Sequence, residues 1–588
     1  MLRLIVRPNP SPLGALAVAL GLLLGFSMSI NAQPAQPPAQ ATAGGDTVRA
    51  EARISTAAPS VLSPRVRQGR LEIDRQRLAE AAPYRSLDGT GNNLLDSETG
   101  ATYTTLLRLL PSDYGDGISS LAGPDRPSAR AISNLVTAQP SSFTNDGGIT
   151  DYLWQWGQFL DHDMDLTEGN DPPEAANIVI PMGDPFFDPE FTGTATMSLN
   201  RSVYDLTTGT GVDNPRQQLN EITAWIDASN VYGSDEFRAA ALRTLDGTGR
   251  LLTSSGNLLP FNTLGMPNAG GDGPELFLAG DVRANEQAGL TAMHTLFVRE
   301  HNRLAQEIAL AEPSLDGEEI YQRARRMVGA LMQAVTYNEF LPLLLGPDAL
   351  PPYSGYRPDL DARISNLFAT AAYRFGHSAL SPVIRRLDAQ GEEIQEGHLP
   401  LRDAFFAPHR IADEGGIEPI LRGLASQACQ VPDPMVVDDL RNFLFGAPGS
   451  GGFDLTALNI QRGRDHGLPS YNDTRRGLGL PPAAGFSDIT SDPMMSQRIL
   501  QAYGDVEQVD LWVGGLAEDA VPGSMLGEVF TLVLVDQFTA LRDADRFWYQ
   551  RILSPQELAE VESTRLSDII RRNTPIGDEI QDDIFLLP

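Results

Sequence analysis

Cysteine is nearly absent from this chain of 588 residues, which contains Cys429 and no second thiol. A single cysteine cannot form an intramolecular disulfide, so the fold must be held by core packing and by any ions that it binds. The apolar fraction of 41% is ample for a large core. We expect Cys429 to be a small buried apolar residue rather than a reactive thiol.

Basic side chains are scarce relative to acidic ones. The chain has 44 Lys and Arg against 76 Asp and Glu, which gives a net charge of −32. Nucleic-acid binding requires a basic surface, so this balance argues against it. A soluble acidic surface is the simplest interpretation. Histidine is also rare, with seven in the whole chain, so each one that falls in a polar motif is a candidate for chemistry.

Long apolar runs are confined to the N-terminus. Arg3 and Arg7 precede an apolar stretch at residues 13–30, and Ala32 follows as a small residue at a cleavage position. This order is typical of an export signal, so we expect a signal peptide at residues 1–32. The stretch is near the lower length limit for crossing a bilayer, and an uncleaved anchor is the alternative. We therefore expect a secreted or periplasmic protein with no membrane span after signal cleavage.

Composition divides the rest of the chain into a tether and one large domain. Residues 33–83 are rich in Ala, Pro, Gln, Ser and Thr, with little apolar material to fold around. Residues 84–588 are globular in composition and show no internal repeat. Their helical periodicity predicts a mainly α domain with long irregular loops, and helices at residues 281–310, 318–345 and 525–541.

The segment at residues 156–165 places a histidine between two aspartates at the end of an apolar helical pattern. In a helix, Gln158 and His162 share a face because they are four residues apart. Asp161 and Asp163 differ by about 200°, so they point to nearly opposite sides. One carboxylate can then look into a pocket beside His162. A surface carboxylate pair around a core histidine is the alternative.

A second segment, at residues 223–233, is rich in side-chain oxygens. Thr223, Asp227 and Ser229 lie at spacings of four and two. Such a loop can wrap a hard cation with side-chain and carbonyl oxygens, and Asp163 could add a further carboxylate. The alternative is a hydrogen-bonded turn with no metal.

A third segment carries Arg283, Glu286 and Gln287, which would cluster on one face of a helix. The alternative for this cluster is a surface ion pair between residues three apart.

Two later segments contain a further histidine and a pair of arginines. His377 follows Gly376, which permits a close backbone approach. A buried neutral imidazole is a good axial ligand for iron when its other nitrogen has a hydrogen-bond partner, and Asn459 could accept that hydrogen bond. Arg462 and Arg464 could pair with the carboxylates of a cofactor. The alternatives are a core histidine and an internal salt-bridge network with Asp465.

Together and in this order, the five segments resemble the animal-type haem peroxidase superfamily, which includes myeloperoxidase, lactoperoxidase, peroxidasin and bacterial relatives. The likeness runs from about residue 84 to about residue 576, and the stretches at 88–93 and 293–304 support it. It implies a single large haem peroxidase domain. The lack of disulfides departs from the animal members.

The resemblance implies a role for each residue above. His162 is similar to the distal histidine, Arg283 to the distal arginine and Gln158 to the pocket glutamine. The resemblance implies a bound haem b with ester links to the two carboxylates Asp161 and Glu286. His377 is similar to the iron ligand and Asn459 to its hydrogen-bond partner, and Arg374 and Arg462 are similar to two contacts near the haem. One Ca²⁺ would be held by residues similar to the family's calcium ligands: Asp163, Thr223, Trp225 through its carbonyl, Asp227 and Ser229.

The resemblance also implies an activity, namely reduction of hydrogen peroxide and oxidation of a small anionic or phenolic donor such as bromide, iodide, thiocyanate or a phenol. Gln287 stands where some members have a methionine bonded to the haem, so no third covalent link is expected, and chloride oxidation is in doubt. A fatty-acid dioxygenase of the cyclooxygenase type is the alternative. Those enzymes place a radical-forming tyrosine three residues before the proximal histidine, where this chain has Arg374, with Tyr373 one residue further away. A non-catalytic exported binding protein on the same scaffold is a third possibility.

Overall fold

The computed structural model describes residue 65 and residues 82–588. The expected signal peptide at residues 1–32 lies outside the described residues, and so does nearly all of the expected tether at residues 33–83.

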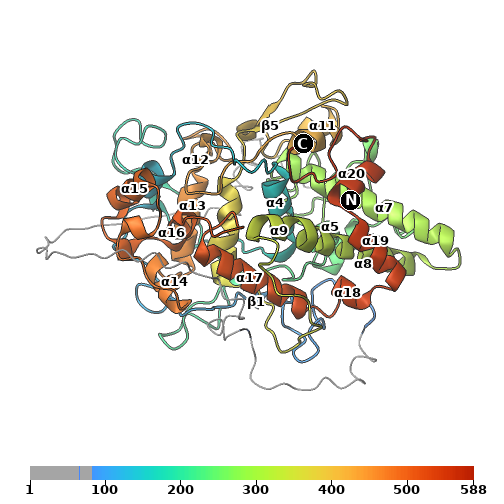
Figure 1. Cartoon of the computed structure of the whole chain (residues 1–588), viewed down its shortest axis with the longest axis horizontal. Coiled ribbons are helices and arrows are strands. Elements are labelled where there is room, and N and C mark those ends of the chain that lie inside the picture. Colours follow the sequence, from blue (N-terminus) through green and yellow to red (C-terminus); the bar gives the residue numbers. More distant parts are fainter. Residues whose placement is uncertain (1–64, 66–81) are drawn as a thin grey trace, which may run out of the picture.

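The described chain is mainly helical, as predicted from the sequence (Figure 1). The α-helices are α3 (Ala129–Ile132), α4 (Tyr152–Met164), α5 (Ser229–Tyr232), α6 (Glu236–Ala241), α7 (Ala288–Ala311), α8 (Gly317–Val335), α9 (Leu341–Leu345), α10 (His409–Ala412), α11 (Glu418–Ala425), α12 (Asp438–Arg441), α13 (Leu455–Asp465), α14 (Tyr471–Gly477), α15 (Pro493–Tyr503), α16 (Leu511–Ala517), α17 (Glu528–Asp543), α18 (Tyr549–Ile552), α19 (Pro555–Ser563) and α20 (Leu566–Asn573). Short turns of tighter or wider helix are η2 (Ser133–Thr137), η3 (Ser255–Asn257), η4 (Thr336–Phe340), η5 (Phe368–Ala372), η6 (Tyr373–Ser378), η7 (Leu401–Asp403), η8 (Phe486–Asp488) and η9 (Val506–Gln508).

Strands are short and few among the described residues. They form three antiparallel pairs of two residues each: β1 (Thr104–Thr105) with β4 (Leu219–Asn220), β2 (Ile178–Val179) with β3 (Thr196–Met197), and β5 (Val383–Ile384) with β6 (Leu399–Pro400). Thr104 pairs with Asn220, and this pairing fixes the register of the first pair. Pairs this short cannot form a core of their own, so the helices form the core.

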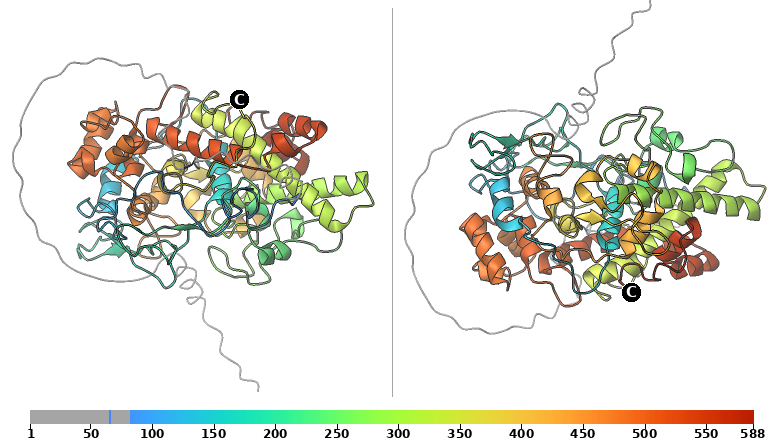
Figure 2. Two further views of the ribbon diagram at one scale, coloured as in Figure 1. Left: turned by 90° about the horizontal axis from the view of Figure 1, so that it is seen from below. Right: turned by 90° about the horizontal axis from the view of Figure 1, so that it is seen from above.

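Helix α4 lies in the middle of the molecule and packs against α7, α5 and η6 (Figure 1). Its apolar side chains are buried all round, and Phe159 stacks on Phe297 of α7 with ring centroids 5.1 Å apart. A helix that is apolar on nearly every face belongs in the interior. Figures 1 and 2 show α7 and α8 side by side at one end of the molecule and α14, α15 and α16 at the other.

The helix predicted at residues 281–310 begins later, and this part of the prediction was wrong. Helix α7 starts at Ala288, and Gln287 is its N-cap, with extended backbone and a side chain that accepts a hydrogen bond from the Gly289 amide. Residues before it form a turn, in which the Glu286 amide donates to the Arg283 carbonyl over 2.8 Å. A capping side chain ends the helical pattern there, so Arg283, Glu286 and Gln287 do not share a helix face.

The other two predicted helices are present with small shifts in their ends. Residues 317–345 form the continuous helical path of α8, η4 and α9, and α17 covers residues 528–543. In the described part of the chain, no helix is both long enough and apolar enough to cross a bilayer.

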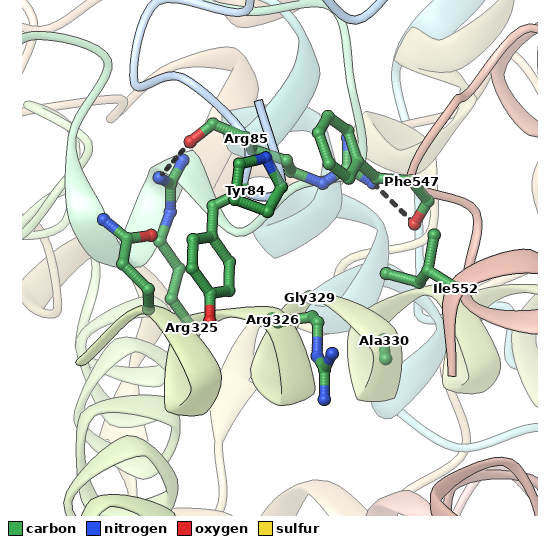
Figure 3. A pocket seen from close by; sticks show the side chains of 10 residues that line it. Tyr84, Arg85, Arg325, Arg326, Gly329, Ala330, Phe547 and Ile552 are labelled. Carbon is green, nitrogen blue, oxygen red and sulfur yellow. Dashed lines mark hydrogen bonds between the residues drawn. The ribbon is translucent and has the colours of Figure 1, made fainter. Parts of the chain in front are cut away.

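The start of the folded body is anchored on α8. The Arg325 guanidinium donates to the Arg85 carbonyl over 3.0 Å, and Arg85 in turn donates to the Phe547 carbonyl over 3.2 Å. Figure 3 shows the pocket between Tyr84, Arg85 and α8. Its volume of about 20 Å³ leaves room for little more than one water, so it is too small for a cofactor.

Cys429 is fully buried, as predicted from the sequence. Its sulfur lies 3.3 Å from the side-chain amide of Asn145, and burial raises the pKa of the thiol.

Candidate functional site

Helix α4 carries four of the predicted site residues. The two aspartates face different environments, as helical geometry predicts: the Asp161 side chain is 30% exposed, and Asp163 is fully buried. Asp163 faces the segment at residues 227–230, while Asp161 lies 3.8 Å from the Arg283 guanidinium. The alternative of a surface carboxylate pair is therefore wrong for Asp163.

His162 lies between two carboxylates that come from the turn before α7. Its Nδ1 is 3.5 Å from Asp281 Oδ1, and its Nε2 is 3.8 Å from Glu286 Oε2. The imidazole is 4% exposed. Burial, helped by the nearby Arg283 charge, holds the pKa of His162 well below its ordinary value. The ring is therefore neutral at pH 7 and can accept a proton.

Asp281 holds Arg283 in one orientation. The guanidinium donates to both carboxylate oxygens, over 3.0 Å from Nε and 2.8 Å from Nη2, and the Arg283 amide donates to Asp281 over 2.7 Å. These contacts outweigh the effect of burial and hold the pKa of Asp281 well below its ordinary value. The role of Asp281 was not predicted, because the sequence does not show that the side chain of an aspartate two residues before an arginine points toward that arginine.

Gln158, Glu286 and Gln287 form a hydrogen-bonded chain. The Gln158 amide donates to Glu286 over 2.8 Å, and the Gln287 amide donates to the Gln158 carbonyl oxygen over 3.0 Å. Burial raises the pKa of Glu286 to about 6. The alternative of a surface ion pair between Arg283 and Glu286 is wrong, since Arg283 pairs with Asp281 and Glu286 binds Gln158.

Asp165 is a second residue that sequence reasoning missed. It is 6% exposed, its Oδ1 has no hydrogen-bond partner in the structure, and its backbone carbonyl accepts from Arg283 over 2.9 Å. Burial, together with the nearby Asp165, raises the pKa of Asp161 to about 7. Two carboxyls near one another and partly out of water favour a site that binds or bonds a further group.

The second predicted histidine lies on η6, which packs against α4. Burial, helped by the Arg374 charge, lowers the pKa of His377 to about 3, so this ring is also neutral. Its Nδ1 lies 2.8 Å from the side-chain amide of Asn459 on α13, and Arg374 donates to the Asn459 oxygen over 3.2 Å. The side chains of His377, Asn459 and Arg374 therefore form one connected chain of contacts.

The Asn459 amide is oriented with its nitrogen, not its oxygen, toward His377. This orientation differs from the predicted one, in which Asn459 accepts from the imidazole. The observed orientation leaves the oxygen for Arg374, which can only donate. An imidazole that ligates iron through Nε2 carries its proton on Nδ1, so ligation requires the amide to turn over.

The two arginines of α13 separate into different networks. Arg462 donates to Asp465 over 2.9 Å, as the salt-bridge alternative predicted, and also to Ser202 over 2.8 Å. Arg464 pairs instead with Asp510 over 2.7 Å and is buried. Arg464 thus has a structural role, whereas the Arg462 side chain is partly exposed.

The predicted cation-binding residues surround Asp163. Its carboxylate accepts from the amides of Asp227, Ala228 and Asn230 and from the Ser229 hydroxyl, over 3.0 to 3.1 Å. Burial and the nearby Asp227 raise the pKa of Asp163 to about 8.

Within the same segment, the Thr223 hydroxyl donates to Asp227 over 3.2 Å, and Asp227 Oδ2 is buried with no hydrogen-bond partner in the structure. Trp225 lies between them and is 1% exposed. Two buried carboxylates with an unsatisfied oxygen fit a cation better than they fit a metal-free turn. The described residues contain no group of three or more His, Cys, Asp or Glu side chains placed to hold a metal, so a cation here would also need hydroxyl and carbonyl oxygens.

This segment also contacts the turn that holds Arg283. A Cβ atom on Gly280 would lie 2.4 Å from the Ser229 carbonyl oxygen, so only glycine permits the approach. Asn230 accepts from the Asp281 amide over 2.9 Å and donates to the Phe159 carbonyl of α4 over 2.7 Å. Ala228 has a positive φ of 64°, a conformation that costs a non-glycine residue energy. The segment at 223–230 therefore fixes both α4 and Asp281.

The site has room for a bound cofactor, because six of its side chains are partly exposed although most residues around them in the sequence are buried. These partly exposed residues are Gln158, Asp161, Arg283, Glu286, Arg374 and His377. A Cβ atom on Gly376, beside His377, would meet nothing within 4 Å. A neutral imidazole, two carboxyls and two arginines that keep accessible surface form the donor set that suits a haem with its two propionates.

Comparison with known proteins also indicates a haem-binding peroxidase domain over most of the chain. The model of the animal haem peroxidase family matches residues 84–585. A peroxidasin homolog of Mus musculus is 39% identical over an alignment that covers 85% of this chain and 37% of the relative. Peroxinectin A of Dictyostelium discoideum is 37% identical, with 86% of this chain and 96% of the relative covered. The chain therefore spans about a third of the length of the first relative and nearly all of the second.

Solved structures share the fold. Peroxidase A from Dictyostelium discoideum superposes with a TM-score of 0.79 at 36% identity, covering 86% of this chain and 99% of that one. A fatty acid alpha-dioxygenase of Arabidopsis thaliana has a TM-score of 0.74 at 21% identity, with 89% of this chain and 86% of that one covered, and shows the fold alone. The family match over residues 84–585 and these relatives lead to one conclusion: the chain belongs to the animal haem peroxidase family.

Proposed function

We propose that this protein is an exported haem peroxidase that reduces hydrogen peroxide and oxidises a small donor, either a halide or pseudohalide such as bromide, iodide or thiocyanate, or a phenol. The observation that carries the proposal is the pairing of a buried neutral His162 with an Arg283 that Asp281 fixes in place. A neutral base next to a fixed cation is the arrangement that cleavage of the peroxide O–O bond requires.

The partly exposed residues and their neighbours would hold the haem. His377 would bind the iron from η6, with Asn459 as the hydrogen-bond partner of its other nitrogen after the amide turns over. Asp161 and Glu286 would form ester links, and Arg374 and Arg462 would contact the propionates. When bound, the haem iron supplies the electron-transfer chemistry of the reaction.

His162 would transfer the proton of the peroxide. Heterolytic cleavage requires one oxygen of the peroxide to lose a proton and the other to gain one. Because its pKa is low, the His162 ring is free to take that proton as a base and return it as an acid. Arg283 stays cationic, so it would stabilise the negative charge that develops on the leaving oxygen.

Gln158 and Asp281 would position these groups. Gln158 is held by Glu286 and Gln287, so its amide is fixed at the edge of the region where a peroxide, a water or a halide would bind. Asp281 contacts both Arg283 and His162. One carboxylate would thus keep the acid–base group and the cation at a constant separation.

One Ca²⁺ would bind at Asp163, Thr223, the Trp225 carbonyl, Asp227 and Ser229. The support for this is the buried, unsatisfied Asp227 oxygen and the raised pKa of both aspartates, which a divalent cation would relieve. The ion would be structural, but it would bind the residue next to His162.

Steady-state kinetics test the function directly. Purified protein with haem is assayed with hydrogen peroxide against a panel of bromide, iodide, thiocyanate, chloride and a phenol. We expect peroxide-dependent oxidation of one or more of the first three donors or of the phenol, and little oxidation of chloride, because Gln287 replaces the methionine that bonds the haem in some relatives. A protein that binds haem and oxidises none of the donors contradicts the proposal.

The dioxygenase alternative is disfavoured by the position of Tyr373. Its ring stacks on Phe368 with centroids 4.6 Å apart and packs edge-on against Phe538, so the side chain belongs to an apolar aromatic cluster. Oxygen uptake with linoleate in the absence of peroxide would support that alternative. The third possibility, a non-catalytic binding protein, predicts that no haem Soret band appears after expression with haem supplied.

A further inference from the structure

Arg65 is a buried residue that lies outside the family match at residues 84–585. Its side chain is 3% exposed, although arginine is rarely buried without a matching set of acceptors. The arginine therefore needs an explanation that the peroxidase chemistry does not provide.

All three nitrogens of the Arg65 guanidinium have acceptors in the folded body. Nε forms an ion pair with Asp536, and Nη2 donates to Gln537 over 2.6 Å. Nη1 donates to the backbone carbonyls of Asp361 and Arg363 over 2.9 and 3.2 Å. The Arg65 carbonyl also accepts from the Asp361 amide over 2.6 Å.

The acceptors belong to two elements that Arg65 joins. Asp536 and Gln537 lie on α17, and the carbonyls belong to residues 361–365, which lead into η5 and η6. Gln537 also accepts from the Ser365 amide over 2.9 Å. Burial raises the pKa of Asp536, and the Arg65 charge opposes that rise. Without Arg65, the mostly buried Asp536 carboxylate and the Asp361 carbonyl would lose the donor that Arg65 supplies, while the Arg363 carbonyl would still accept from the Gln537 amide.

We propose that Arg65 is an anchor that joins α17 to residues 361–365, and that this contact stabilises the folded domain. This anchor is separate from the contacts of Arg85 on α8. It acts on the chain that leads to η6, and so it stabilises the element that carries His377. Cleavage of the chain between Arg65 and Tyr84 would remove this anchor and leave the family-matching region at residues 84–585 intact.

The test compares full-length Arg65→Ala and Arg65→Lys with the wild type, and uses Arg476→Ala as the matched control. Arg476 is an exposed arginine paired with Glu507. We expect the unfolding temperature of Arg65→Ala to fall by about 5 °C, and hydrogen exchange at residues 361–366 to accelerate about tenfold or more. Arg65→Lys should recover little, because one ammonium cannot reach acceptors on both elements. Arg476→Ala should change neither quantity.

A double-mutant cycle makes the test specific. Asp536→Asn alone should lower the unfolding temperature, but in the Arg65→Ala background it should raise it, because it removes a buried charge that has lost its partner. If Arg65→Ala does not fold, the same comparison is made with Arg65→Lys as the background. Effects that simply add, or an Arg65→Ala variant that matches the control, overturn the proposal. Neither measurement requires catalysis, so either outcome leaves the proposed function to its own test.

Discussion

At the scale of single residues, Asp281 decides how the site is arranged. Among the residues that the structure describes, it is the one carboxylate that contacts both Arg283 and His162, and its own amide donates to the Asn230 carbonyl. Asp281 is thus a positioning residue, and its loss should affect the reaction with peroxide more than the oxidation of the donor.

We expect Asp281→Asn to slow the reaction of the haem protein with peroxide by about 10- to 100-fold, because an amide holds the guanidinium less firmly and lacks the negative charge. The measurement is the second-order rate constant from stopped-flow mixing, with the equilibrium dissociation constant for cyanide as a readout that does not depend on turnover. Asp281→Glu should restore part of the rate. Asp272→Asn, at an exposed acid in a nearby loop, is the control. An unchanged rate in Asp281→Asn would show that Asp281 has no such role.

Asp161 and Glu286 give a second prediction at this scale. Both carboxyls are partly exposed and have raised pKa values, of about 7 and 6, so each is readily available in its protonated form. If they form ester links, acidified organic solvent will leave the haem on the wild-type protein. Asp161→Asn and Glu286→Gln should each leave one link, and the double variant should release the haem completely. Free release from the wild type would rule out covalent attachment.

At the scale of secondary-structure elements, the spacing of residues within one helix could be interpreted from sequence, whereas contacts between elements could not. The opposite orientation of Asp161 and Asp163 follows from helical geometry, and α4 shows it. The start of α7 at Ala288 was missed, because Gln287 caps the helix with its side chain and residues 283–286 turn instead. Asp165 was missed because its partner Arg283 is 118 residues away along the chain.

The cation-binding segment at residues 223–230 gives the prediction for this scale. We expect a chelator to lower the unfolding temperature of the protein, and added Ca²⁺ to restore it, because the ion would relieve two buried carboxylates. Asp227→Asn should abolish the response to Ca²⁺. Bound calcium, measured by atomic absorption, should be about one per chain in the wild type and near zero in the variant. A wild-type protein indifferent to chelation would contradict the assignment.

At the scale of the whole molecule, residues near both ends of the described chain form hydrogen bonds with the helical domain. Near the C-terminus, the Leu587 amide donates to the Gly148 carbonyl over 2.7 Å, just before α4, and the Arg65 side chain donates to Gln537 of α17 over 2.6 Å. Helical periodicity in the sequence correctly predicted a mainly α fold, as the described helices show. It could not show how these ends are placed, since both contacts join residues that are hundreds of positions apart.

Global stability should depend on pH through Glu339, which lies in η4 away from the site. Burial raises its pKa to about 7, and its Oε2 has no partner in the structure, while Oε1 accepts from the Leu566 amide over 3.0 Å. The folded state therefore binds the proton more tightly than the unfolded state. Its contribution to stability is fully present below about pH 4.5 and is lost as the pH rises through about 7.

Glu339→Gln should remove this dependence. We expect the variant to be more stable than the wild type by about 1–2 kcal/mol at pH 8 and equal to it near pH 4. Denaturant unfolding at both pH values measures the difference. Glu312→Gln, at an exposed position, should show no such change. A variant that loses the same stability at both pH values would show that the carboxylate acts through packing alone.

The burial of Cys429 has a consequence for the lifetime of such an enzyme. Peroxide attacks the thiolate form of cysteine, and burial keeps this thiol both protonated and out of reach. Since the chain has no other cysteine, it has no accessible thiol that peroxide could oxidise and no intramolecular disulfide that a reductant could open. Its durability during turnover should thus be limited by damage to the haem and to methionines.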